Sequence, residues 1–246
     1  MEKITRTEFD ALMRSVFTDF GGITLTEEQS ERFYLFAVRL LEENEKYNLT
    51  AIRSFEGVVK KHFYDSVVAA SAIPKNYSVI DIGTGAGFPS LPIAIMRTDL
   101  KITSLDSTEK KVNFVKNTAE MLGLDNLTAV FGRAEELASK DSLYRDSFGC
   151  AIGRSVAGLP VLCELCLPFV KPNGIFVAMK SASAEHEIAE SENARRILGA
   201  ALTVEQKTLY TDTETGDTRM LFVISKTSRT PEKYPRAYGR IKNKPL

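Results

Sequence analysis

The sequence has little cysteine, no long apolar run and no signal for export. Its 246 residues include three cysteines, an odd and small set that favours a reducing compartment over a disulfide framework. No apolar stretch approaches the roughly 18–20 residues of a membrane span. The first residues lack a secretory hydrophobic region and a small-residue cleavage site. These absences predict a cytoplasmic protein without a membrane segment.

An excess of charge is also lacking, since 32 basic residues balance 32 acidic ones. Apolar residues make up 43% of the chain and charged residues 26%, which is ordinary for a globular protein. A chain of this length forms one large domain or one domain with an extension. The zero net charge does not favour a nucleic-acid partner, although partners respond to local charge.

The first 75 residues have the pattern of a helical unit. Thr26 and Gln29 form a capping box at the start of a second helix, and a third is expected over residues 56–73. Gly21 and Gly22 end the first helix. Its apolar face, at spacings of three and four, consists of Phe9, Leu12, Met13, Val16, Phe17 and Phe20.

From residue 77 onward, short β-branched runs alternate with helical segments. A helix capped by Ser107 follows the second strand, and two final strands form an antiparallel hairpin. The strands are expected at 77–83, 101–106, 127–131, 150–155, 175–180, 201–211 and 219–227. The pattern predicts an α/β fold, a Rossmann-like, doubly wound, mostly parallel seven-stranded sheet whose last strand is antiparallel and at one edge. We expect a helical cap at 1–75, the sheet domain at 76–228 and a basic tail at 229–246.

A glycine-rich loop follows the first expected strand, in the stretch VIDIGTGAGFPSLPIAI at 79–95. Glycines here let the chain turn tightly and remove the Cβ atoms that would block a ligand. Asp106 ends the second strand about 20 residues further on, where an acidic residue binds ribose hydroxyls. Gly83, Gly85 and Asp106 therefore predict an adenosine-type cofactor, and a tight turn without a ligand is the alternative.

The loop spacing favours a cofactor without a pyrophosphate. In the dinucleotide fingerprint G-x-G-x-x-G the third glycine comes one place later than Gly87. Phe88 puts bulk where a pyrophosphate needs bare backbone. The stretch resembles the opening motif of class I S-adenosylmethionine methyltransferases, so S-adenosylmethionine is the expected cofactor. An NAD-dependent oxidoreductase and an RNA-binding module that only senses the cofactor are the competing hypotheses.

Further stretches, in the same order along the chain, resemble one family. They are NEKYNLTAI (44–52), KHFYDSV (61–67), LDSTEKKVNFV (105–115), GRAEEL (132–137), GRSVAGLPVLCELCLPFVKPNG (153–174) and YPRAYGRIKNKPL (234–246). The family is the small-subunit ribosomal RNA methyltransferase G, or glucose-inhibited division protein B. The resemblance covers nearly the whole chain after about residue 40 and little of the N-terminal helices.

The resemblance implies an enzyme that methylates N7 of one guanine in bacterial 16S ribosomal RNA, as naked RNA or in the small subunit. Guanine N7 has a free lone pair on the major-groove edge, so we expect direct in-line transfer without a catalytic acid or base. Gly85 is expected at the cofactor from the loop itself. The residues that the family motifs would place at the cofactor are Gly83, Phe88, Asp106 at the ribose, Ala134 and Glu135 at the adenine end, and Arg154.

RNA contacts are expected from local basic patches. The tail carries seven basic residues from Lys226 onward against one acid, with two tyrosines between them. Arg236 and Arg240 are its candidate contacts, and a solvated tail is the alternative. Arg53 belongs to a second patch with Lys60, Lys61 and His62. Lys180 ends the fifth strand beside the expected site, as an RNA contact or an ordinary strand-end charge.

No metal site is expected. Cys163 and Cys166 have zinc or redox spacing, but they lie in an apolar helical run and no second cysteine pair completes four ligands. Core packing is the better interpretation for both. For His62 a helix-surface or structural role is the better interpretation, with catalysis as the minority alternative.

Overall fold

The N-terminal part of the chain is helical in the computed structural model, which describes residues 4–154, 157–212 and 215–246. The capping box is present, because the Gln29 N–H donates to Thr26 Oγ1 at 3.2 Å and the Gln29 side chain accepts the Thr26 N–H. The helices are α1 (Arg6–Met13), its π-helical extension Arg14–Phe20, α2 (Glu27–Tyr47), α3 (Phe55–Val58), the π-helical turn Val59–Tyr64, α4 (Asp65–Ala69) and the 3₁₀ turn Ala70–Ala72. The helix expected over 56–73 is therefore confirmed as a run of helical turns.

The described residues form one seven-stranded sheet, as predicted. Its order is β3-β2-β1-β4-β5-β7-β6, with β1 to β5 parallel and β7 antiparallel to both of its neighbours. The order reverses between β1 and β4, where Val79 lies opposite Cys150. The strands are β1 (Ser78–Ile82), β2 (Lys101–Asp106), β3 (Leu127–Phe131), β4 (Phe148–Arg154), β5 (Val170–Ser181), β6 (Glu205–Thr211) and β7 (Thr218–Ser225).

The antiparallel strand β7 does not lie at the edge, contrary to the prediction. It pairs with β5 on one side and β6 on the other, so β6 forms the edge. The reason lies in the two sequences. Residues 221–224 of β7 are apolar and buried on both faces, whereas β6 has an exposed or half-exposed residue at every position. A strand that is apolar on both faces fits the interior of a sheet, and a polar strand fits its edge.

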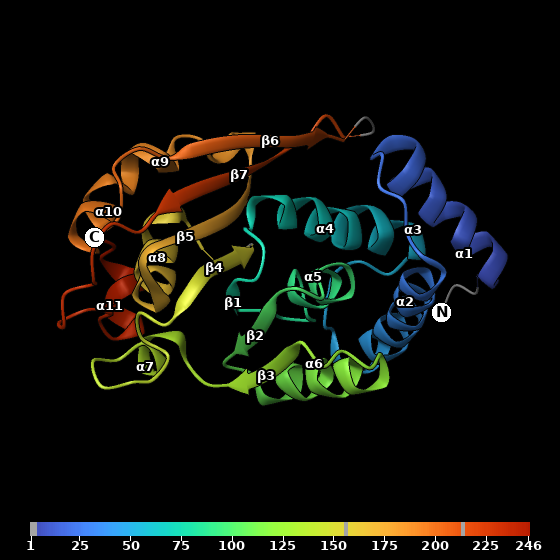
Figure 1. Ribbon diagram of the computed structural model, residues 1–246, viewed down its shortest axis with the longest axis horizontal. Helices are drawn as coiled ribbons and strands as arrows, with labels where there is room; N and C mark the ends of the chain where they lie inside the picture. The colour runs from blue at the N-terminus through green and yellow to red at the C-terminus, as the bar shows by residue number, and fades with distance from the viewer. Residues whose placement is uncertain (1–3, 155–156, 213–214) are drawn as a thin grey trace.

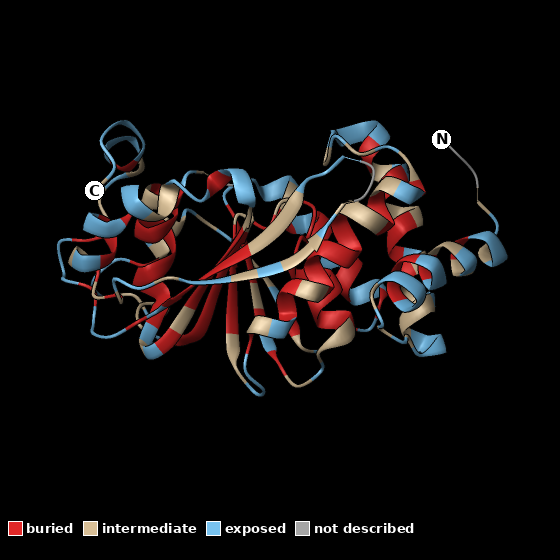
Figure 2. Cartoon of the chain, turned by 90° about the horizontal axis from the view of Figure 1, so that it is seen from above, coloured by how far each residue is buried: buried red, intermediate tan, exposed pale blue. Residues whose placement is uncertain are grey.

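Helices cover both faces of the sheet and create two separate cores (Figures 1 and 2). Successive residues of one strand point to opposite cores, as with Phe176 and Val177 of β5. The sheet-domain helices are α5 (Ser90–Met96), α6 (Glu109–Met121), α7 (Ala134–Leu137), α8 (Leu159–Cys166) with the 3₁₀ turn Leu167–Phe169, the 3₁₀ turn Ala182–Ala184, α9 (Glu187–Glu190), α10 (Glu192–Ile197) and α11 (Tyr238–Asn243).

The N-terminal helices share a core with one face of the sheet. The Phe36 ring stacks on Phe63 at 5.2 Å and on Phe88 at 5.2 Å between centroids. Since Phe88 follows the glycine loop, this stack connects α2, the turn before α4 and the loop. Figure 1 shows these helices (blue) at one end of the molecule and α11 (red) at the other.

Two turns are fixed by hydrogen bonds that the sequence analysis did not predict. Thr108, not Ser107, is the N-cap of α6, and its N–H donates to Asp106 Oδ1 at 2.9 Å. The carboxylate at the end of β2 thus fixes the N-cap residue, while no side chain among the described residues caps the first turn of α6. After α2, the buried Asn44 accepts the Thr50 N–H at 2.8 Å and donates to the Ile52 carbonyl.

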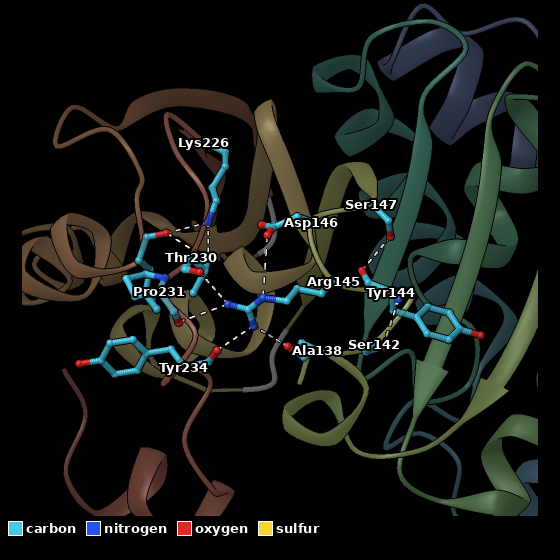
Figure 3. A network of polar contacts seen from close by, with 11 residues as sticks. Ala138, Ser142, Tyr144, Arg145, Asp146, Ser147, Lys226, Thr230, Pro231 and Tyr234 are labelled. Atoms are coloured by element: carbon cyan, nitrogen blue, oxygen red, sulfur yellow. Dashed lines mark hydrogen bonds and ion pairs between the residues drawn. The ribbon is translucent and has the colours of Figure 1, made fainter. Parts of the chain in front are cut away.

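The C-terminal segment is docked on the sheet domain rather than separate from it. Arg145 donates to the carbonyls of Thr230, Pro231 and Tyr234 at 2.7–3.2 Å (Figure 3). Arg236 and Glu164 of α8 form a bidentate ion pair at 2.6 and 2.9 Å, and the Glu164 side chain is 0% exposed. These contacts hold the segment that leads into α11.

We expect Arg236→Ala to destabilise the fold by about 3 kcal/mol, because it leaves a buried carboxylate without its partner. The free energy of unfolding from urea titration, followed by circular dichroism, measures the change. Arg240→Ala is the matched control, since Arg240 is exposed on the same segment, and it should stay within about 0.5 kcal/mol of the wild type. Equal stability of the two variants would contradict this account.

Candidate functional site

Two cavities lie at the carboxyl ends of the parallel strands, one on each side of β4. The first, here the β1–β3 cavity, has a volume of about 340 Å³ and is lined by residues that end β1 and β2 and follow β3. The second, here the β5–β7 cavity, measures about 620 Å³ and is lined from β5, β7 and the helical cap. Arg154, at the end of β4, lines both. This is the point where the strand order reverses, the usual ligand position in such sheets.

The glycine loop is shaped by positive φ angles and by Asp106. Gly85 has φ +60° and Gly87 has φ +88°, a region that side chains with a Cβ rarely adopt. A Cβ on Gly87 would also meet Leu91 at 2.3 Å, whereas one on Gly85 would reach nothing closer than a carbonyl at 4.0 Å. The Gly85 N–H donates to Asp106 Oδ2 at 3.0 Å. The loop and the end of β2 therefore form one unit.

Asp81 holds the far end of the loop from inside the protein. It is 0% exposed, and its Oδ2 accepts the Ser90 N–H at 3.3 Å while Oδ1 has no hydrogen-bond partner among the described residues. Burial raises the pKa of Asp81 to about 7. The Thr84 and Ser90 hydroxyls bond to each other at 2.7 Å across the loop.

Arg154 is a largely buried cation held by the helical cap. Its Nη1 lies 3.0 Å from His62 Nδ1, and its guanidinium lies 5.1 Å from the Phe88 ring centroid. Burial, and next the Arg154 charge, lower the pKa of His62 to about 3. Because Arg154 can only donate, we assign His62 Nδ1 as its acceptor, although Nδ1 also lies 3.1 Å from the Lys61 carbonyl. In this tautomer Nε2 donates to Thr50 Oγ1 at 2.8 Å. His62 is therefore a neutral, buried acceptor rather than a residue of the helix surface.

Five of the seven residues predicted at a cofactor lie together around the β1–β3 cavity: Gly83, Asp106, Ala134, Glu135 and Arg154. The other two are not among the residues that line it. Gly85 directs its N–H to Asp106, and Phe88 is 3% exposed with its ring stacked on His62 at 4.3 Å.

The β5–β7 cavity has a polar lining that sequence reasoning largely missed. The Tyr210 hydroxyl donates to Asp65 Oδ1, and Arg219 Nε lies 3.8 Å from Asp65 Oδ2. Burial raises the pKa of Asp65, opposed by these partners. Lys180, which was predicted, donates to Glu187 at 2.7 Å and to the Ala157 carbonyl at 2.9 Å. Tyr210 and Arg219 lie opposite each other in the β6–β7 hairpin, whereas Asp65 lies in α4, so no local sequence pattern connects Asp65 to them.

The structure separates the four residues predicted to contact RNA. Lys180 lines the β5–β7 cavity, and Arg53 is exposed beside Ile52 of the same lining, with its Nη2 bonded to Asn48 at 3.0 Å. Arg240 is exposed on α11. Arg236 is committed to Glu164, so its guanidinium serves the docking of the C-terminal segment.

Residues 4–154, 157–212 and 215–246 contain neither a candidate metal cluster nor a membrane-spanning helix. This part of the chain brings together no group of three or more His, Cys, Asp or Glu side chains that could bind a metal. None of its helices has both the length and the apolar character needed to cross a membrane. Cys163 and Cys166 are fully buried free thiols in α8, and burial raises the pKa of both.

The β1–β3 cavity fits a nucleoside cofactor on three observations. The space above Gly85 is open, as a ligand against the loop requires. Asp106 already accepts two N–H groups, and a carboxylate has about four acceptor sites, so capacity remains for ribose hydroxyls. The volume of about 340 Å³ is within the usual range for small-ligand sites. Gly83, Asp106, Ala134, Glu135 and Arg154 are the residues that would hold such a group.

The chain is similar to known proteins over most of its length. A family model described as rRNA small subunit methyltransferase G matches residues 29–211. The protein named Ribosomal RNA small subunit methyltransferase G in Clostridium beijerinckii is 44% identical over 227 residues, 92% of this chain and 94% of that one. Its namesake in Clostridium perfringens is 41% identical over 240 residues, 97% and 98% of the two chains.

A solved structure shows the same fold. TYW2 of M. jannaschii, in complex with AdoMet, aligns with a TM-score of 0.53 and 13% identity. The alignment covers 72% of this chain and 79% of that one. At this identity the likeness concerns the arrangement of strands and helices, which is the mostly parallel sheet described above.

We expect Asp106→Ala to weaken S-adenosylmethionine binding by roughly 1.5–3 kcal/mol, the contribution of hydrogen bonds to a charged group. The variant loses both the ribose acceptor and the bond that orders the loop at Gly85. Calorimetric titration measures the dissociation constant. Glu109→Ala is the control, because it removes an exposed carboxylate three residues further on. An unchanged dissociation constant for Asp106→Ala would make Asp106 a structural residue only.

Proposed function

The chain belongs to the rRNA small subunit methyltransferase G family, and we propose that it transfers a methyl group from S-adenosylmethionine to N7 of one guanine in 16S ribosomal RNA. The RNA is bound as part of the small ribosomal subunit or alone, in the cytoplasm. Membership of the family and the methyltransferase-like fold support the coarse activity. The atom and the base are what the resemblance to the family implies, and the free lone pair of guanine N7 is compatible with a direct transfer.

The observation that carries the proposal is the shared position of Arg154. It borders the β1–β3 cavity, which suits the cofactor, and the β5–β7 cavity, which is large enough for a nucleobase. When bound, S-adenosylmethionine supplies an electrophilic methyl group. A donor in one cavity and an acceptor in the other would meet beside Arg154. Its role is to keep the two ligands in line, since alignment is the main requirement of a direct transfer.

No residue needs to remove a proton from the proposed substrate. Guanine N7 has a free lone pair, so the protein contributes orientation and a suitable electrostatic environment. His62 lines the β5–β7 cavity, but with a pKa of about 3 it is a weak base. Its bond to Arg154 makes it a positioning residue for that guanidinium.

The charge around the β5–β7 cavity suits an RNA substrate. Two acidic residues, Asp65 and Glu187, stand against four basic ones, which are Lys61, Arg154, Lys180 and Arg219. A surplus of positive charge attracts phosphates. Arg53 and the exposed cations of the C-terminal segment would extend this contact beyond the cavity.

Mapping of the modified base tests the function directly. Small subunits from a bacterium without N7-methylated 16S RNA are incubated with the protein and S-adenosylmethionine. Reduction and aniline cleavage then cut the RNA at N7-methylguanine. We propose a single cut in 16S RNA that depends on protein and cofactor. Methyl transfer to another atom or another RNA, or none, would contradict the proposal.

We expect the triple variant Arg240→Gln, Lys242→Gln, Lys244→Gln to bind small subunits more weakly and with a flatter salt dependence. Loss of three phosphate contacts should reduce the slope of log K against log salt by about 2–3. Arg236 stays in place because it pairs with Glu164.

The matched control changes three exposed lysines at the opposite, amino-terminal edge of the sheet, Lys75, Lys101 and Lys171, to Gln. It removes the same charge and should leave the slope unaltered. If the two triple variants behave alike, the C-terminal cations do not contact RNA.

A further inference from the structure

The wall of the β1–β3 cavity includes one residue from the far end of the chain. Tyr238, the first residue of α11, lines the cavity together with Asp106, Ala134 and Glu135. It lies more than 100 residues from each of them, so only the docking of the C-terminal segment brings it there. Its half-buried ring is the sole aromatic side chain among the residues that line this cavity in the described part of the chain.

The backbone around Tyr238 is held from both sides. Before it, Arg236 donates its backbone N–H and its guanidinium to the fully buried Glu164 of α8. Further back, Arg145 fixes the carbonyls of residues 230, 231 and 234 (Figure 3). After it, Ile241 is 0% exposed in the core beside α8. Tyr238 is therefore presented to the cavity by an ordered segment, which lowers the entropy lost on ligand contact.

The ring belongs to the end of the cavity where Glu135 lies. The Arg133 guanidinium is 5.2 Å from the Tyr238 ring centroid, and Arg133 Nε donates to Glu135 Oε1 at 2.7 Å. Glu135 follows β3, the strand next to the one that ends in Asp106. A nucleoside with its ribose at Asp106 would therefore direct its base toward Glu135, Arg133 and Tyr238.

We propose that Tyr238 contacts the adenine of the cofactor and that the C-terminal segment is part of the cofactor site. An aromatic ring offers a π face that suits a purine, and such contacts contribute measurably to binding. The inference rests on the proposed use of S-adenosylmethionine and deepens it by adding a residue that determines recognition of the base.

Calorimetry with three variants tests the contact. Tyr238→Ala should bind S-adenosylmethionine about tenfold more weakly, and Tyr238→Phe should stay within about twofold of the wild type because the ring remains. Asn243→Ala, an exposed residue of the same helix, should be unchanged. The fragment 5′-methylthioadenosine should lose the same factor as the whole cofactor, since it keeps the adenine.

Each result of this titration has a definite meaning. Unchanged affinity of Tyr238→Ala, or an equal loss in Tyr238→Phe, would overturn the ring contact while the proposed function stands. A wild type that binds no S-adenosylmethionine would overturn both. A loss for the whole cofactor without a loss for the fragment would place the effect away from the adenine and overturn the inference.

A fluorescent variant provides a second test if Tyr238→Ala does not fold. The chain has no tryptophan, so Tyr238→Trp carries a single indole at the proposed contact. Its emission should change on titration with S-adenosylmethionine and with 5′-methylthioadenosine, and not with methionine. Emission that stays constant while calorimetry records binding would overturn the proposal.

Discussion

The arrangement of the site depends on one buried cation, Arg154 at the end of β4. A guanidinium removed from water needs acceptors, and the His62 ring and the Lys61 carbonyl, both in the helical cap, lie within reach at 3.0 and 3.3 Å. The Phe88 ring provides its face from the loop side. His62 can accept only while it is neutral, and its own burial together with the Arg154 charge keeps it so. The cap, the glycine loop and the sheet are thus connected through one side chain, and the two cavities meet there.

Most elements of this fold could be predicted because their signals are local. The capping box at Thr26 and the β-branched run that forms β1 act within a few residues, and both are confirmed. The position of β7 could not be predicted from the hairpin alone, since it depends on which strand of the pair is apolar and buried on both faces. The N-cap of α6 was assigned wrongly, because the helix begins one residue later, with Thr108 as the N-cap, whose N–H donates to Asp106.

The residues of the candidate site also differ in whether local sequence could predict them. Gly83, Asp106 and Arg154 end or follow strands that meet at the switch point, so a parallel sheet brings them together whatever the loops do. Asp65 and Tyr238 reach the cavities only through packing between distant segments, and a single sequence carries no local trace of that. Arg236 shows the reverse error. Its charge in a basic tail suggested a contact with RNA. The buried Glu164 that binds it lies 72 residues away, in a helix whose other residues are apolar.

The docking of the C-terminal segment also changes what its basic residues imply. A free tail would let RNA contacts vary independently of the cofactor, and its removal would affect RNA alone. Here the segment that carries Arg240 and Lys242 also carries Tyr238, and the ion pair to α8, the Arg145 hydrogen bonds and the buried Ile241 hold it in place. Whatever shifts α11 therefore acts on a wall of the β1–β3 cavity and on an exposed cationic surface at once. Tyr238 at the proposed cofactor site and the exposed cations Arg240 and Lys242 therefore belong to one short helix.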